Sequence, residues 1–493
     1  RMSLNWLLLT TLVIKVLARK ENPFLCDTQL CLEESRRLKE YIDESVNPCE
    51  DFHLFACGKF VKHATIPETE TYISTVSKLQ EKVLKQIKTL LVDAPALPSE
   101  PKFVTMARDL YETCLRKDLG NKSVAILKQF MQEAGGWPLL EGGDWDSKKF
   151  DWLDAVLKLH EFGFRQANFF GLKIVENHEK PGTHIIEIHE PTLGLDADFL
   201  AEGPKTNEIE PYVFYLVELA SRLGIKEDKM KQEMSHILYF EIELARMLTD
   251  GKEKNMVPPA TTLGNLKQKR SDINWDKYLK SMLNRKEDLS PDEPILVNKM
   301  SFIRKLEEVL KITEKKTLAN FLMFRTVREV AKFLTEHIRK LDFDFTRMYH
   351  GRLFPDPKWK ECAAYTENSL DFAVGWLYTR KYITPEAKTN VYAVSERIQT
   401  ELKKSMETVD WLTDESRKLS LHKLDKMKKY IAYPKEILHE TNLKDFYGKV
   451  NLNKETWLEQ HLELAKVKWE HELQKLEGAV VRHDWRERGG LAR

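Results

Sequence analysis

The chain has no excess of charge of either sign, because 78 Lys and Arg face 77 Asp and Glu over 493 residues. The two signs are interspersed, so no net field favours nucleic acid or an anionic membrane. Apolar residues make up 42% of the sequence, which is ample for the core of two or three domains or of one large fold. The composition therefore excludes disordered and collagen-like classes, and no nucleic-acid partner is expected.

Long hydrophobic runs are nearly absent. The run from Leu4 to Val13 follows Arg1 and is interrupted by Lys15, well short of the roughly 20 apolar residues that span a bilayer. Small residues in Val16-Leu17-Ala18 suit a signal peptidase. We therefore expect residues 1–18 to be a signal peptide, with an incomplete N-terminal anchor as the alternative. Either predicts a secreted protein or one on the extracellular face of the plasma membrane.

The usual catalytic motifs are missing. There is no glycine-rich phosphate loop and no G-x-S-x-G nucleophile motif. The zinc-peptidase motif H-E-x-x-H needs a second histidine four positions after the first. Each of the five His-Glu dipeptides lacks it; they begin at His160, His178, His189, His439 and His471. The sequence thus offers no catalytic, cofactor-binding or metal-binding residues.

Two other histidine features have structural explanations. His184 and His189 are five positions apart on a predicted strand, so they point to opposite faces and do not form a metal site. His53 lies inside a predicted helix and is interpreted as a surface or packing residue.

Helical periodicity dominates the chain. Helices are predicted at 33–43, 77–91, 102–115, 151–162, 230–248, 299–310, 317–341, 369–382, 385–412, 414–428 and 454–476. The strand pair 171–176 and 183–189 is joined through Pro181-Gly182, which indicates a hairpin. Pro258-Pro259 marks a linker between helical blocks. The predicted fold is mainly α, a large multi-helix lobe with one small β-hairpin at about residues 171–189.

The segment Asn47 to Phe60 is predicted to be one short helix. Asn47 is a suitable N-cap, and Gly58 a suitable residue just past the C-terminus. Cys49 and Cys57 are eight positions apart, which places their Cα atoms about 12 Å apart on a helix. A disulfide tolerates about 7 Å at most, so each cysteine needs a partner elsewhere.

Six cysteines in a chain that carries a secretory signal predict disulfides, whose connectivity the count leaves open. Cys26 and Cys31 lie close enough in a loop to form a small ring. The sequon Asn121-Lys122-Ser123 makes Asn121 a candidate glycosylation site.

The opening segment resembles the neprilysin and endothelin-converting-enzyme family of zinc metallopeptidases. Seven residues match that family's N-terminal signature: Pro48, Cys49, Asp51, Phe52, Ala56, Cys57 and Gly58. The resemblance continues in order through Ile66-Pro67-Glu68, Leu110-Tyr111, Gly136-Trp137-Pro138, Leu193-Gly194-Leu195, Thr317-Leu318-Ala319-Asn320 with Arg325, Trp359, Asp410-Trp411-Leu412 and Lys423-Leu424. It covers the chain from Cys26 to about Trp485.

The resemblance implies two disulfides, Cys26 with Cys31 and Cys114 with Cys362. It also implies that Cys49 and Cys57 bond to cysteines near the family's C-terminus, and no cysteine follows Cys362 in this sequence. Both would then be unpaired because the catalytic zinc domain is missing. The expected layout is a family N-terminal region at 19–485, with a tether helix at 47–60 and a helical lobe from about 77, followed by a divergent tail at 486–493.

The function implied by the resemblance is that of the N-terminal, substrate-gating portion of a zinc metalloendopeptidase that acts on small extracellular peptides. The zinc of the full-length family has no ligands in this chain, so the chain alone is expected to be inactive. Tyr72 stands where neprilysin has an arginine that engages a peptide's carboxylate, which weakens a dipeptide-releasing preference. The alternative is a secreted, non-enzymatic protein that binds peptides or a peptidase partner.

Overall fold

The computed structural model describes residues 26, 28–92, 100–226, 230–250, 260–477 and 485–487. The predicted signal segment 1–18, the Pro258-Pro259 linker and residues 488–493 of the predicted tail lie outside these ranges. The chain divides into two compact units, residues 1–78 (unit 1) and 79–493 (unit 2). The division falls within helix α4 (Thr75–Val92).

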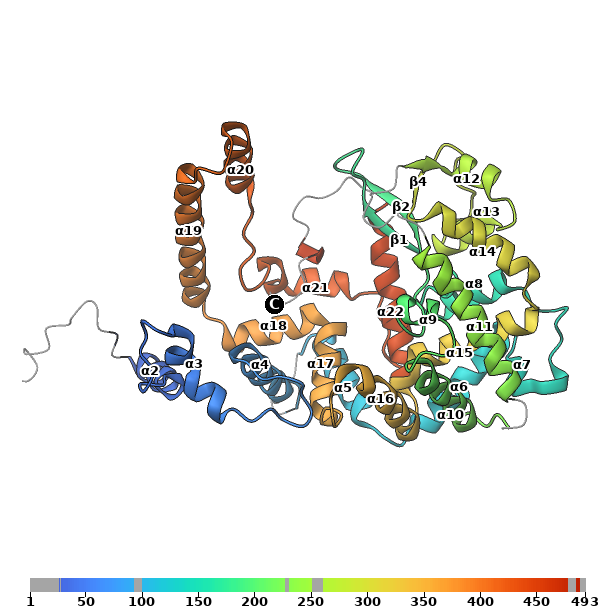
Figure 1. Cartoon of the computed structure of the whole chain (residues 1–493), viewed down its shortest axis with the longest axis horizontal. Helices are drawn as coiled ribbons and strands as arrows, with labels where there is room; N and C mark the ends of the chain where they lie inside the picture. Colours follow the sequence, from blue (N-terminus) through green and yellow to red (C-terminus); the bar gives the residue numbers. More distant parts are fainter. Residues whose placement is uncertain are drawn as a thin grey trace, which may run out of the picture. The chain divides into compact units, whose positions relative to one another are not determined.

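Unit 1 contains helices α2 (Gln29–Tyr41) and α3 (Phe52–His63), which pack against each other (Figure 1). The rings of Tyr41 and Phe60 meet edge to face at 5.0 Å between centroids. The side chain of Thr28 caps α2 by accepting a hydrogen bond from the Cys31 backbone N–H.

The tether helix was predicted at 47–60, and both of its predicted ends are wrong, because the helix in the structure, α3, spans Phe52–His63. α3 begins at Phe52 because the Asp51 side chain accepts the Leu54 N–H at 2.8 Å. The Asn47 side chain instead accepts the Cys49 N–H at 3.0 Å, closing a turn before the helix. Gly58 lies inside α3, not after it, and a Cβ there would meet the Cβ of Asp43 at 2.8 Å. Gly58 therefore permits close packing, not helix termination.

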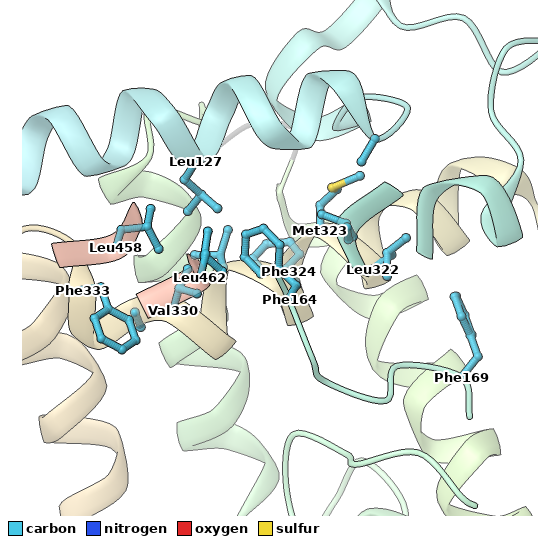
Figure 2. Packing of buried hydrophobic residues seen from close by; sticks show 14 of the residues in the cluster. Leu127, Phe164, Phe169, Leu322, Met323, Phe324, Val330, Phe333, Leu458 and Leu462 are labelled. Carbon is cyan, nitrogen blue, oxygen red and sulfur yellow. The ribbon is translucent and has the colours of Figure 1, made fainter. Parts of the chain in front are cut away.

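Unit 2 is built around α15 (Lys315–Val330), in which every residue from 317 to 327 is buried. Apolar side chains therefore project from all sides of this helix into neighbouring elements. Figure 2 shows Leu322 and Phe324 of α15 with Leu127 of α6, and Leu462 of α22 in the same cluster. The elements on which the core depends are thus far apart in the sequence.

Helices make up most of the rest of unit 2, which confirms the predicted mainly α fold class. These helices are α5 (Lys102–Leu115), α6 (Gly120–Glu133), α7 (Pro138–Glu141), α8 (Trp152–Phe162), α9 (Ala197–Ala201), α10 (Ile209–Arg222), α11 (Met230–Thr249), α12 (Leu263–Lys269), α13 (Trp275–Met282), α14 (Met300–Ile312), α16 (Glu336–His350), α17 (Lys358–Ser369), α18 (Asp371–Tyr382), α19 (Pro385–Thr408), α20 (Asp414–Lys426), α21 (Glu440–Phe446) and α22 (Trp457–Gln474).

The single helix predicted at 317–341 is wrong. α15 ends at Val330, a 3₁₀ turn covers Ala331–Phe333, and α16 begins at Glu336. The Thr335 side chain caps α16 by accepting the Ile338 N–H, so the chain changes direction there. Buried apolar residues continue through the break, which is why spacing alone did not reveal it.

The predicted hairpin is confirmed and belongs to a larger sheet. β1 (Gly171–Glu176) pairs antiparallel with β2 (His184–His189), and Ile174 faces Ile186 in the register. β2 pairs in parallel with β4 (Pro294–Val297), and β3 (Thr261–Thr262) completes the order β1-β2-β4-β3. The two added strands are too short to show a pattern in the sequence.

Candidate functional site

The structure brings four of the six cysteines together in two disulfides. Cys114 of α5 is bonded to Cys362 of α17, with Cα atoms 5.7 Å apart and both side chains buried. Cys26 is bonded to Cys31, with Cα atoms 5.9 Å apart, and Cys31 lies in α2 rather than in a loop. Two disulfides are typical of a protein folded in an oxidising compartment.

Cys49 and Cys57 are free in the structure. Cys49 lies in the turn before α3 and is exposed, whereas Cys57 lies on α3 and is half-buried. The prediction that both lie on one helix is wrong, so the helical separation of about 12 Å does not apply to them. Their assignment to partners in another domain stays a prediction.

The candidate glycosylation site Asn121 is exposed in the first turn of α6. Ser123, the third residue of the sequon, is 1% exposed. The chain thus presents the amide that would carry the glycan on its surface, and the modification stays a prediction.

Metal-binding geometry is absent from the part of the chain that the structure describes. Within those residues no three His, Cys, Asp or Glu side chains lie close enough together to hold a metal ion. His160 of α8 shows how one histidine is used instead: its Nδ1 lies 2.9 Å from the Arg165 guanidinium and its ring meets Trp469 edge to face. Burial, with Arg165 adding to it, lowers the pKa of His160 to about 3. The residues present do not fit a catalytic zinc.

Among the described residues, no helix combines the length and the apolar character needed to cross a bilayer.

A cavity of about 620 Å³ follows one face of α22. The helix begins with a capping box in which the Thr456 hydroxyl accepts the Glu459 N–H and the Glu459 carboxylate accepts the Thr456 N–H. The lining residues of α22 recur at helical spacing: His461, Leu464, Lys468, His471 and Lys475. These residues form one continuous stripe on α22 that faces the cavity.

The opposite wall of the cavity is apolar. It includes Phe372 of α18, and Phe446 at the end of α21 with the adjacent Tyr447. Phe372 and Phe446 meet edge to face at 5.0 Å, and Phe446 contacts the His471 ring at 4.4 Å. Val450 extends this wall. A ligand in the cavity would bury apolar surface against aromatic rings, which is favourable.

The end of the cavity near the N-terminus of α22 is polar and uncharged. Tyr365 of α17 hydrogen-bonds through its hydroxyl to His461 Nδ1 at 2.9 Å, and the His461 ring stacks on Phe333 at 4.1 Å. Burial lowers the pKa of His461 to about 3, with a further contribution from Lys332. His461 is therefore neutral at pH 7 and acts as a hydrogen-bonding group, not as a proton carrier.

The basic residues of the cavity lie in the second half of the α22 stripe and beyond it. Lys468 stands at the middle of the stripe and Lys475 at its end, and Arg486 also lines the cavity, together with the carboxylates of Asp371 and Glu472. Lys475 forms an ion pair with Glu472 at 3.0 Å. Lys468 has no ion-pair or hydrogen-bond partner among the described residues. The lining therefore carries three basic and two acidic side chains.

Sequence reasoning missed this cavity. The stripe on α22 mixes Lys, His and Leu, a composition that is also typical of solvated helix faces. Its partners on α17 and α18 lie about 90 to 110 positions away in the sequence, and its partner on α21 lies about 15 to 30 positions away, so only the tertiary fold joins them. A volume of about 620 Å³ lies within the usual range for ligand sites, roughly 300–1,000 Å³. The arrangement suits recognition through charge, hydrogen bonds and apolar contact.

Comparison with known proteins identifies relatives along nearly the whole chain. The pattern of peptidase family M13 matches residues 48–434. Neprilysin-2 of Drosophila melanogaster is 25% identical over 481 residues, covering 94% of this chain and 62% of the relative. Endothelin-converting enzyme 1 of Mus musculus is 25% identical over 471 residues, covering 94% and 60%. The chain thus spans about three fifths of the length of these curated relatives.

Two solved structures share the fold. The zinc metalloprotease ZMP1 of Mycobacterium tuberculosis, in complex with an inhibitor, superposes with a TM-score of 0.74 at 18% identity, covering 90% of this chain and 65% of that one. PEPO from Lactobacillus rhamnosis superposes with a TM-score of 0.72 at 14% identity, covering 89% and 68%. At such identities the likeness shows the fold alone.

Proposed function

The chain belongs to peptidase family M13, and on this basis we propose that it is the N-terminal, substrate-gating portion of a neprilysin-like zinc metalloendopeptidase. The observation that carries the proposal is the family match over residues 48–434, within which α17 and α18 form part of the cavity. The substrates proposed are small extracellular peptides. The two disulfides support an extracellular location.

No catalytic step is assigned to this chain, because its described residues do not fit zinc and its sequence has no H-E-x-x-H motif. The chain contributes walls that admit a peptide and exclude bulky proteins. We further propose that the family region runs over residues 19–485, after a signal peptide at 1–18. Cys49 and Cys57 would tie α3 and the turn before it to cysteines of a catalytic domain.

The direct test is a peptidase assay on the purified 493-residue chain with a small fluorogenic peptide and added zinc. We expect the chain to show no zinc-dependent cleavage, that is, no peptidase activity that a metal chelator removes. Chelator-sensitive cleavage that persists through purification would overturn the assignment of the chain as a non-catalytic portion.

A second test is the coding sequence that follows codon 493. We expect it to encode H-E-x-x-H and at least two further cysteines. A stop codon at that point would favour the alternative, a secreted, non-enzymatic protein that binds peptides or a peptidase partner. The cavity along α22 is the observation that favours this alternative.

A further inference from the structure

We propose that one exposed face of α19 is the contact surface of a symmetric dimer, in which two copies of this chain pair their α19 helices in opposite directions. The occupant of this face is thus a second copy of the chain. The inference goes beyond the proposed function and uses none of the residues that line the α22 cavity.

The α19 helix has 24 residues, and none of them is buried. Along one face it carries six uncharged residues at intervals of three or four positions, which places them in a single stripe. The eight charged residues of α19 all lie elsewhere on the helix. This outer stripe, every member of which is exposed, consists of Ala387, Val391, Val394, Ile398, Leu402 and Ser405.

The four large members of the outer stripe give it its apolar character. Val391, Val394, Ile398 and Leu402 are between 42% and 64% exposed, although each would be favourably removed from water. Such side chains are unremarkable when they are scattered singly, but here they are consecutive along one helix face. A contiguous exposed apolar surface of this kind is typical of a site of protein association.

The side of α19 that contacts α20 is polar. Gln399 donates a hydrogen bond to the Leu424 carbonyl at 2.7 Å. Lys403 forms an ion pair with Asp425 at 3.0 Å. The Arg417 side chain of α20 donates to carbonyl groups at the C-terminal end of α19, where the two helices meet (Figure 1). At about 100° per residue these contacts lie about a third of a turn from the outer stripe, so α20 leaves the stripe uncovered.

The charges at one edge of the outer stripe favour an antiparallel copy. Arg397 and Glu401 lie one helical turn apart on this edge. A two-fold axis midway between them brings Arg397 of each copy level with Glu401 of the other copy, so one dimer contains two ion pairs. A parallel pair would instead place this edge against the opposite edge of the partner helix, where Ser395 and Gln399 carry no charge.

Both charged groups are available for this contact. Arg397 has no ion-pair or hydrogen-bond partner among the described residues. Glu401 pairs with Lys404 at 2.7 Å, but both side chains are more than 60% exposed, so the pair is weak and easily exchanged. The edge of the stripe is therefore complementary to itself once a second copy is turned round.

The same axis places apolar side chains at the centre of the contact. Ile398 and Leu402 lie on either side of the axis, so the two copies interdigitate these side chains. The stripe from Ala387 to Ser405 spans 18 steps, or about 27 Å, on a helix about 10 Å wide, which gives a footprint of about 270 Å². Stable complexes bury about 800 Å² of accessible surface on each partner, so this dimer is weak, with a dissociation constant of about 10–100 µM.

The test is analytical ultracentrifugation of the purified full chain at concentrations of about 1–200 µM, which bracket the expected dissociation constant. Free thiols are alkylated first, so that Cys49 and Cys57 cannot link two chains. We expect a reversible change from one chain to two, without larger species. Ile398→Lys introduces a charge at the centre of the contact and should raise the dissociation constant about tenfold or more. The matched control is Thr400→Lys, which changes an exposed residue on the opposite side of α19 and should leave dimerisation intact.

A charge exchange tests the antiparallel arrangement. Arg397→Glu and Glu401→Arg, made singly, each place like charges level with one another, and each should raise the dissociation constant about threefold to tenfold. The double variant Arg397→Glu/Glu401→Arg re-forms both ion pairs with their signs reversed. It should therefore return the dissociation constant to near the wild-type value. Far-UV circular dichroism and the urea midpoint of each variant show that it is folded.

Four results would overturn the inference. They are a single chain at every concentration, association that continues beyond two chains, a dimer that Ile398→Lys leaves unchanged, and a double charge variant that dimerises no better than the single ones. In the first case the outer stripe is left for another occupant, such as a domain that follows residue 493 in a longer protein. None of these results contradicts the proposed function, which the coding sequence after codon 493 tests separately.

Discussion

The disulfide between Cys114 and Cys362 is expected to be a principal constraint on the unfolded state of unit 2. It closes a loop of 248 residues and joins α5 to α17. In the chain-entropy relation, a loop of about this length contributes about 5.5 kcal/mol to the free energy of unfolding. Measured losses on removing native disulfides are about 2–5 kcal/mol. We expect Cys114→Ala/Cys362→Ala to cost about 3–5 kcal/mol.

The assay is urea unfolding followed by tryptophan emission under non-reducing conditions. Every tryptophan except Trp6 lies in unit 2, so the signal reports the unit that contains the bond. The double variant should shift the midpoint to lower urea with little change in slope. Both native side chains are at most 1% exposed, so the small cavities left by alanine add to the loss.

The matched control is Cys26→Ala/Cys31→Ala, which removes a disulfide with a sequence separation of 5 in unit 1. It should leave the tryptophan transition of unit 2 in place. The reasoning is refuted if the long-loop variant unfolds at the wild-type midpoint, or if both variants shift it equally.

Four further outcomes are expected. Thiol titration of the unreduced chain should find two reactive groups, Cys49 reacting faster than Cys57 because it is more exposed. His461 has a pKa lowered to about 3 in the folded chain against 6.5 unfolded, so stability should fall as pH drops from about 6.5 towards 3, and His461→Gln should reduce this dependence, while buried His160, whose pKa is also lowered to about 3, keeps its share. Glu241→Ala should cost about 3–5 kcal/mol because it removes the buried carboxylate that is paired with Arg325 and that accepts hydrogen bonds from the Gly194 N–H and the Tyr212 hydroxyl. Asn121→Gln should abolish a glycosidase-sensitive mass difference in protein secreted from eukaryotic cells.

Each of these has a control or a contradicting result. Absence of reactive thiols would show that Cys49 and Cys57 are paired in some other way. His178→Gln, at an exposed site in the hairpin connection, should keep the wild-type pH dependence. Glu243→Ala breaks only an exposed ion pair with Arg246 and should cost less than about 1 kcal/mol. An unchanged mass after glycosidase treatment of the wild type would contradict glycosylation.

The sequence by itself determined the fold class and the family. The range 102–115 was predicted with the bounds of α5, because its apolar residues repeat at helical spacing and Pro101 precedes it. The β1–β2 hairpin was likewise visible in local alternation and in Pro181-Gly182. Both patterns involve residues that are close in the sequence, so these elements can be predicted without knowledge of the tertiary contacts. The signature around Cys57 identified the family in the same way.

The ends of α3 could not be predicted, because several nearby residues are each suited to begin or end a helix. Asn47 and Asp51 are both good caps, and the fold uses Asp51 for α3 and Asn47 for the preceding turn. Gly58 looked like a helix terminator, yet its place inside α3 follows from the approach of Asp43. α6 was not predicted, although Leu127 and Met131 are buried in the core at the helical spacing of four residues; the third buried residue on that face, Ser123, is polar.

Only the tertiary structure decided the candidate site. The pairing of β2 with β4 joins residues more than 100 positions apart, and no local pattern encodes it. In the same way, the sequence of α22 does not distinguish His461 and Lys468 from residues of a solvated helix face, and only the packing of α17, α18 and α21 around them forms the cavity. A cavity is a property of surfaces that meet, so its volume and its charge arise from packing. The sequence determines which side chains are available, and the fold determines which of them face the same space.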